Sequence, residues 1–129
     1  MLTYVAVPRL NLGAVHRAEA ETVARKIAMD LRLARSRAIL YATVSPAGCA
    51  LNMIGSAPYT GYQLVDLAGP TVVATHSIPA GVECTGGTHF EFDPLGRLKD
   101  GSGTALQVTA EDRTLTITVL PATGTVKCL

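Results

Sequence analysis

Residues 18–42 lie within the longest stretch of the chain without glycine or proline, and strong helix formers such as alanine, arginine and leucine dominate them. Apolar side chains recur there at steps of three and four residues, which places them on one side of a helix. The sequence therefore predicts a helix over 18–42 whose apolar stripe packs on the rest of the fold. The residues predicted to make that contact are Val23, Ile27, Leu31, Ala34 and Ala38. Because Pro8 is compatible with a first helical turn, an earlier, frayed start near Pro8 stays open.

Beyond Pro46 the pattern changes to short runs rich in β-branched and aromatic residues, separated by glycine and proline. The clearest run, 114–119, alternates strictly and places Leu115, Ile117 and Val119 on one face of a strand. This pattern predicts a β-region made of short strands. The expected strands are 48–54, 61–67, 71–78, 88–93, 104–109, 113–120 and 124–128.

The predicted strands follow one another without intervening helices. Short loops at 110–113 and 121–124 predict that the last three strands form an antiparallel meander. Because no crossover helices separate the strands, the predicted fold class is α+β, with one long N-terminal helix packed on an antiparallel, sandwich-like β-sheet domain. At 129 residues the chain is expected to form a single globular domain over 18–129, with its helix at 18–42 and its β-domain at 43–129.

Positive charge is concentrated in the N-terminal third of the chain. Residues 1–42 carry seven bases and three acids, whereas residues 43–129 carry four bases and seven acids. Basic side chains can neutralise phosphates, so the candidate nucleic-acid residues are Arg32, Arg35, Arg37, Arg97, Lys99 and Lys127. With four tyrosines, two phenylalanines and no tryptophan, the chain shows no evident platform for stacking bases. A structural helix with a solvated or interfacial basic side is therefore favoured over a nucleic-acid helix.

No motif in the sequence indicates a catalytic or metal site. The three histidines lack neighbouring ligands at a metal-binding spacing, and the three cysteines do not form a C-x-x-C pair. No G-x-S-x-G elbow marks a nucleophile, and the glycine pairs do not fit a phosphate-binding loop. We therefore expect no enzyme activity, no cofactor and no small-molecule substrate. One disulfide among Cys49, Cys84 and Cys128 is compatible with an oxidising compartment, and its pairing stays open.

A set of segments, in order along the chain, carries a resemblance to a known family. They are 4–8 (YVAVP), 33–39 (LARSRAI), 90–96 (FEFDPLG), 113–119 (RTLTITV) and 123–126 (TGTV). Together they resemble the minor pseudopilins of bacterial type II secretion, the general secretion pathway protein H family, and the similar minor pilins of type IV pili. The first segment resembles the end of that family's membrane helix, and the third resembles its aromatic strand with a glycine turn. The resemblance covers most of the chain and implies a pilin-like fold.

The resemblance also implies a location. It implies a protein held in the inner membrane by a single N-terminal helix, with its globular domain in the periplasm. That helix has about 20 apolar residues in the family, whereas this chain has a short apolar run, so residues 1–17 are expected to be the remnant of a longer stem, frayed in isolation. The residues expected to contact neighbouring subunits or lipid are Val5, Val7, Pro8, Leu10, Leu12 and Val15.

The function that the resemblance implies is structural. The subunit is expected to pack side by side with other pseudopilins through its N-terminal helix, in a short filament that helps to drive protein export. The alternative is a minor pilin of a type IV pilus that binds DNA during uptake. The expected partners are thus other pseudopilins or pilins and the inner membrane, with nucleic acid the less favoured partner.

Overall fold

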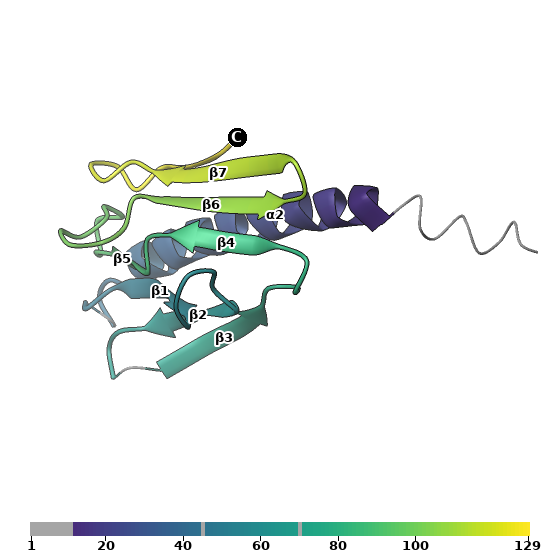
Figure 1. The fold of residues 1–129 in the computed structure, drawn as a ribbon. Coiled ribbons are helices and arrows are strands. Elements are labelled where there is room, and N and C mark those ends of the chain that lie inside the picture. Colours follow the sequence, from purple (N-terminus) through teal and green to yellow (C-terminus); the bar gives the residue numbers. More distant parts are fainter. Residues whose placement is uncertain (1–11, 45, 70) are drawn as a thin grey trace, which may run out of the picture.

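The computed structural model describes residues 12–44, 46–69 and 71–129, which form one long helix and two antiparallel sheets (Figure 1). Helix α2 spans Leu12–Leu40. The strands are β1 (Cys49–Ile54), β2 (Gly61–Asp66), β3 (Thr71–Ser77), β4 (Glu83–Gly86), β5 (His89–Phe92), β6 (Ala105–Ala110), β7 (Arg113–Val119) and β8 (Val126–Cys128). In Figure 1 the helix runs behind both sheets, and its N-terminal turns extend past the ends of the strands.

Helix α2 is 29 residues long and begins earlier than the sequence pattern predicts. It starts at Leu12 rather than at residue 18, and it ends at Leu40 rather than at residue 42. Most helical stability in proteins comes from packing rather than from propensity, so the weak helix formers near the start do not prevent the earlier boundary. The suggested start near Pro8 lies outside the described residues. The prediction of one long N-terminal helix is confirmed, and its boundaries are corrected.

The two sheets have the strand orders β3-β2-β1-β5 and β4-β6-β7-β8, and all neighbouring strands are antiparallel. The last three strands form the predicted meander, in which Ile117 of β7 pairs with Leu106 of β6 and with Cys128 of β8. Leu115, Ile117 and Val119 are buried, as the alternation along β7 predicts. All seven predicted strands are present in the described ranges, close to their expected bounds.

Strand β4 is the strand of the described chain that the sequence pattern did not predict. Only one of its four residues, Cys84, has a buried side chain, and Gly87 follows it directly, so neither length nor alternation marks it. Pairing with β6 holds it in place, with Cys84 opposite Val108. A distant partner strand therefore supplies what the local pattern lacks.

The inner side of helix α2 packs on both sheets at once. It contacts β1 and β5 of one sheet and β6, β7 and β8 of the other. The helix side chains in this contact that are at most 2% exposed are Ala20, Ala24, Ile27, Ala28, Leu31, Ala34 and Ala38. The alanines let the helix approach the sheets closely, while Ile27 and Leu31 fill the space between the sheets and the helix. Val23 is partly buried against the same core. The α+β class, with a helix packed on antiparallel sheets, is confirmed.

Candidate assembly interface

The side of helix α2 that faces away from the sheets carries large apolar residues. Val15 is 46% exposed, Met29 60%, Leu33 46% and Leu40 74%. Their spacing returns them to nearly the same angle around a helix with 3.6 residues per turn. These four residues form an exposed apolar line, here called the outer stripe, opposite the buried alanines. An apolar line of this kind on a helix is typical of a surface that a partner covers.

The sequence pattern did not reveal Met29, Leu33 and Leu40 as a surface, because Arg25 before them and Arg32 among them indicated a solvated side. A search for a second apolar stripe at steps of four and seven residues would have found them. Of the residues expected to contact neighbouring subunits, Val15 lies in the outer stripe and Leu12 is the first residue of helix α2. The other four, Val5, Val7, Pro8 and Leu10, lie outside the described residues.

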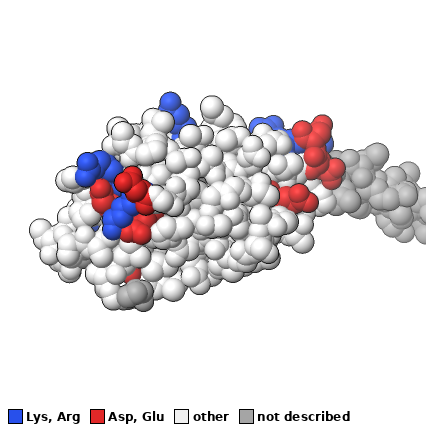
Figure 2. All heavy atoms as spheres, turned by 60° about the vertical axis from the view of Figure 1, so that its left-hand side comes forward, with Lys and Arg blue, Asp and Glu red and all other residues white. Residues whose placement is uncertain are grey.

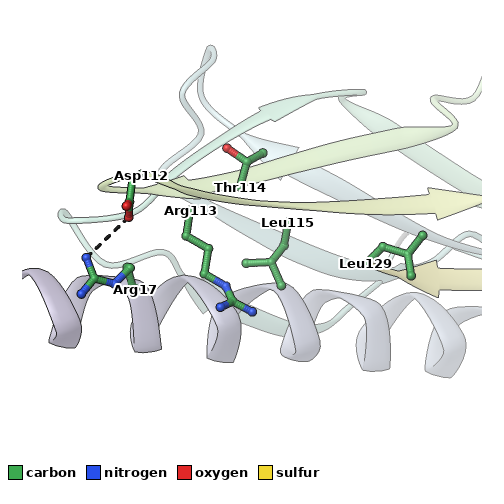
Figure 3. Close-up of a pocket in the computed structure, with 6 residues that line it drawn as sticks. All are labelled: Arg17, Asp112, Arg113, Thr114, Leu115 and Leu129. Atoms are coloured by element: carbon green, nitrogen blue, oxygen red, sulfur yellow. Dashed lines mark hydrogen bonds and ion pairs between the residues drawn. The ribbon is translucent and has the colours of Figure 1, made fainter.

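Basic side chains of the N-terminal half of helix α2 contact acidic side chains of the β6–β7 turn. His16 Nδ1 lies 3.1 Å from Glu111 Oε1, and Arg17 Nη1 lies 3.5 Å from Asp112 Oδ1. Figure 3 shows Arg17 reaching from the helix toward Asp112, while Arg113 points toward the helix from the start of β7. Exposed ion pairs contribute only about 0 to 1 kcal/mol each. These contacts therefore orient the N-terminal end of the helix but contribute little to the stability of the domain.

The C-terminal half of the helix is joined to the β-domain in a different way, by arginines that bind backbone carbonyl groups. Arg35 Nε donates to the carbonyl oxygens of Gly96 (3.1 Å) and Thr123 (3.0 Å). Arg32 Nη2 donates to the carbonyl oxygen of Val126 at 3.0 Å. These hydrogen bonds connect the helix to the β5–β6 loop and to the β7–β8 hairpin.

Gly124 shows how closely these two loops approach each other beside Arg35. Its φ is +72°, a left-handed conformation that favours glycine. A Cβ atom at this position would lie 1.9 Å from the carbonyl oxygen of Gly96 and 3.0 Å from Arg35 Nε. Any other residue would therefore meet both backbone strain and a steric clash. Arg35, Gly96 and Gly124 form one packed junction at this end of the helix.

Two of the predicted nucleic-acid candidates, Arg97 and Lys99, are paired with acids. Arg97 Nε lies 3.2 Å from Asp93 Oδ2, and Lys99 Nζ lies 2.5 Å from Glu91 Oε2. Burial alone would raise the pKa of Glu91, but hydrogen bonds from Lys99 and His89 outweigh it and lower that pKa below its ordinary value. Figure 2 shows basic and acidic side chains gathered in mixed groups on an otherwise uncharged face. The charges of Arg97 and Lys99 are thus largely neutralised within the domain.

The other four candidates have different surroundings. The Arg37 guanidinium lies over the ring of Tyr41, 5.1 Å from its centre. Lys127 is exposed on β8. Arg32 and Arg35 line a common pocket and bind carbonyl groups of the β-domain, so they are not the freely solvated side that the charge pattern suggested. The structure therefore places the six candidates in several separate settings.

A buried carboxylate connects helix α2 to the sheet that contains β2. Asp30 is 4% exposed, and the Tyr62 hydroxyl donates to its Oδ2 at 2.6 Å. Lys26 Nζ lies 3.2 Å from Asp30 Oδ1, and His76 Nε2 lies 3.6 Å from Oδ2. Burial, followed by the hydrogen bond to Asp30, raises the pKa of Tyr62 well above its ordinary value of about 10. Tyr62 therefore stays a neutral donor, and the cluster fixes the rotation of the helix about its axis.

The titratable groups of the described chain do not assemble into a metal site. Across residues 12–44, 46–69 and 71–129, no group of three or more His, Cys, Asp or Glu side chains is placed to hold a metal ion. Cys49, Cys84 and Cys128 are free thiols. Burial raises the pKa of Cys49, and it raises the pKa of Cys84 to about 11, so both thiols stay protonated near neutral pH. None of the helical segments in the same ranges has the length and apolar character that crossing a membrane requires.

A comparison with protein families identifies a match that covers most of the chain. A family model described as type II transport protein GspH matches residues 23–123. The matched range runs from within helix α2 to the β7–β8 loop, so it includes strands β1 to β7. It also includes most of the buried apolar residues on the inner side of the helix and three residues of the outer stripe. No curated protein and no solved structure matches the chain.

Proposed function

The chain belongs to the GspH family of type II transport proteins, and on this premise we propose that it is a structural minor pseudopilin. In this role it is a subunit of the type II secretion pseudopilus, it assembles side by side with other pseudopilins through its N-terminal helix, and it helps to drive protein export. The family match supports a part in type II secretion in general terms. The helix supports the assembly role.

The observation that carries the proposal is the outer stripe. The domain folds with these apolar side chains still 46–74% exposed, so its own core does not require them. Covering apolar surface stabilises a contact by about 25 cal/mol per Å², and a second helix packed along the stripe would cover all four residues. A helix that is apolar on two opposite sides is suited to packing on its own β-domain and on a neighbour at the same time.

The direction of helix α2 supports the proposed orientation. Its N-terminal turns extend past the strands (Figure 1), so a membrane segment joined to them would leave the β-domain free in the periplasm. Residues 1–17 would then belong to the stem, and the globular domain would begin near residue 18. In this arrangement Val5, Val7, Pro8, Leu10 and Leu12 would extend the apolar contact of Val15 toward the inner membrane.

A complementation experiment tests the proposal in the native host. A strain that lacks the gene receives the full-length gene carrying Leu33→Asp or Met29→Asp, and exoprotein in the medium is measured. Each change places a carboxylate in the outer stripe, so we expect secretion to fall although the protein accumulates normally. Val72→Asp is the matched control, because Val72 is 51% exposed but lies on β3 at the far edge of a sheet. Normal secretion with both stripe variants would contradict the proposal.

The alternative function is that of a type IV minor pilin that binds DNA. The observation that favours it is the pair Arg32 and Arg35, which line one pocket and form no ion pair with a carboxylate among the described residues. Its test is binding of duplex DNA by the protein across a salt series, since phosphate contacts weaken steeply as salt rises. Binding that disappears with Arg32→Gln would support this alternative, and no binding at low salt would exclude it.

A further inference from the structure

A small pocket lies toward the C-terminal end of helix α2, between the helix and the β7–β8 hairpin. Its lining residues are Arg32, Arg35, Ser36, Gly124, Thr125 and Val126, and its volume is about 280 Å³. It is called the Arg32–Arg35 pocket below. Two guanidinium groups and two hydroxyl-bearing residues line it, and none of these six lining residues is acidic.

Each arginine uses only part of its hydrogen-bonding capacity to bind the β-domain. A guanidinium has five N–H donors. Arg35 uses Nε, whose hydrogen bonds to Gly96 and Thr123 fix the plane of the group, and Arg32 uses Nη2. Among the described residues, no hydrogen bond involves the two terminal nitrogens of Arg35. The backbone therefore holds the guanidinium groups in place and leaves donors available to a ligand.

Arg32 and Arg35 also lack the acidic partners that four other arginines of the described ranges have. Ion pairs with carboxylates are formed by Arg17, Arg25, Arg97 and Arg113. Within the described ranges, no ion pair includes Arg32 or Arg35. Unmatched positive charge in a concave, partly desolvated site attracts an anion. The planar fork of a guanidinium matches a carboxylate or a phosphate, which can accept two hydrogen bonds from it.

The position of the pocket favours a carboxylate from a protein over the phosphates of a nucleic acid. On helix α2, Leu33 of the outer stripe directly follows Arg32, and Leu40 lies one turn beyond Ser36. A protein that covers the outer stripe would bring its own side chains to the pocket. To bind a nucleic acid, a protein needs several Lys or Arg side chains that are free to contact phosphates along the nucleic-acid backbone. Arg97 and Lys99 are already paired with acidic side chains.

We infer that the Arg32–Arg35 pocket binds an aspartate or glutamate side chain of a neighbouring pseudopilin that packs against the outer stripe. The inference rests on the proposed function and adds the chemistry of the contact. The apolar stripe supplies contact area, and the pocket fixes the register between the two subunits, because its two arginines give the partner's carboxylate a defined place to bind.

The test measures secretion, and co-purification with the other pseudopilins of the same secretion system, for full-length variants in the native host. Arg32→Glu reverses one charge of the pocket, and Ser36→Glu places a competing carboxylate at its rim while both arginines remain. Arg25→Gln is the matched control on the same side of the helix, where Arg25 is paired with Glu21 outside the pocket. We expect both pocket variants to lower co-purification by about tenfold or more, with Arg25→Gln unchanged. Thermal unfolding of each variant verifies that the domain remains folded.

The outcomes separate this inference from the proposed function. If both pocket variants are folded and still co-purify and support secretion at wild-type levels, the inference of a carboxylate-binding site is wrong. If Leu33→Asp abolishes assembly in the same assay, the proposed function stands and only the pocket inference fails; if Leu33→Asp is also neutral, the proposed function fails. Retained co-purification together with loss of DNA binding in Arg32→Glu would assign the pocket to nucleic-acid phosphates and overturn the inference.

Discussion

The two sides of helix α2 are both apolar, but they are built from different residues and face different surroundings. The inner side is mostly alanine, with Ile27 and Leu31 filling the space against the sheets, and it is almost fully buried. The outer side exposes long side chains such as Met29 and Leu40. The inner side therefore determines the stability of the domain, whereas the outer side is available for contacts that the domain alone does not make. Substitutions on the two sides should separate stability from assembly.

The largest expected effect is on the inner side. Leu31→Ala removes a fully buried side chain at the contact of the helix with both sheets. We expect it to lower the free energy of unfolding by about 2 to 5 kcal/mol, because it removes buried apolar surface and leaves a cavity. Urea unfolding followed by circular dichroism measures this change. A loss below about 1 kcal/mol would mean that the inner side does not determine stability.

Alkaline pH should also lower the free energy of unfolding, through the core on the inner side of the helix. Cys84 is fully buried in the same core, and burial raises its pKa to about 11 from 9.0. Between these values the unfolded chain binds fewer protons than the folded one, so stability falls as pH rises, by about 2 to 3 kcal/mol in all. Tyr62, whose pKa is raised too, acts in the same direction above about pH 10.

Urea unfolding at steps between pH 8 and pH 11, with a reductant present, tests this dependence on pH. Cys84→Ala should have a flatter profile than the wild type between pH 9 and pH 11, although it starts from a lower stability because of its cavity. Profiles of equal slope in the two proteins would remove Cys84 as the cause.

A smaller effect on stability is expected at the buried contact between Asp30 of helix α2 and Tyr62 of β2. Tyr62→Phe and Asp30→Asn each alter the hydrogen bond of 2.6 Å that joins the helix to β2. Each should cost about 1 to 3 kcal/mol, because a buried polar group loses its best partner. The double variant should cost less than the sum of the two single variants, since both changes affect one interaction. Strict additivity in urea unfolding would show that the two groups act independently.

The smallest expected effect on stability is on the outer side. Leu33→Ala should change the free energy of unfolding by no more than about 0.5 kcal/mol, as is usual for exposed positions. The same change removes apolar surface from the outer stripe, so it should weaken co-purification with other pseudopilins. A stability loss comparable to that of Leu31→Ala, measured under the same conditions, would abolish the distinction between the two sides.

The features of the fold that arise from a regular spacing of apolar residues along the chain could be predicted from the sequence. Strand β7 alternates strictly, and its three apolar residues are buried. The buried stripe of helix α2 follows from apolar steps of three and four residues. The segments that resemble the pseudopilin family predicted the family itself, and the match over residues 23–123 confirms it.

Features that depend on distant partners could not be predicted. Strand β4 exists through its pairing with β6, and the division of the strands into two sheets is set by long-range pairing. Arg32 and Arg35 bind backbone carbonyl groups more than 60 residues away along the chain. Every residue has a carbonyl group, so the sequence carries no signal for such a bond. The outer stripe differs, because its apolar periodicity is local but basic residues such as Arg25 and Arg32 accompany it and give the same side of the helix a solvated pattern.

The contact of helix α2 with both sheets has a mechanical consequence. With 29 residues and about 1.5 Å of rise per residue, the helix is a rod of about 44 Å that touches β1 and β5 of one sheet and β6, β7 and β8 of the other. A force applied at its N-terminal end acts parallel to this contact, so it loads the whole interface in shear instead of peeling away one strand at a time. Arg35, bound to two loops near the opposite end, adds resistance there. An axial push or pull on the helix would therefore be shared by strands of both sheets at once.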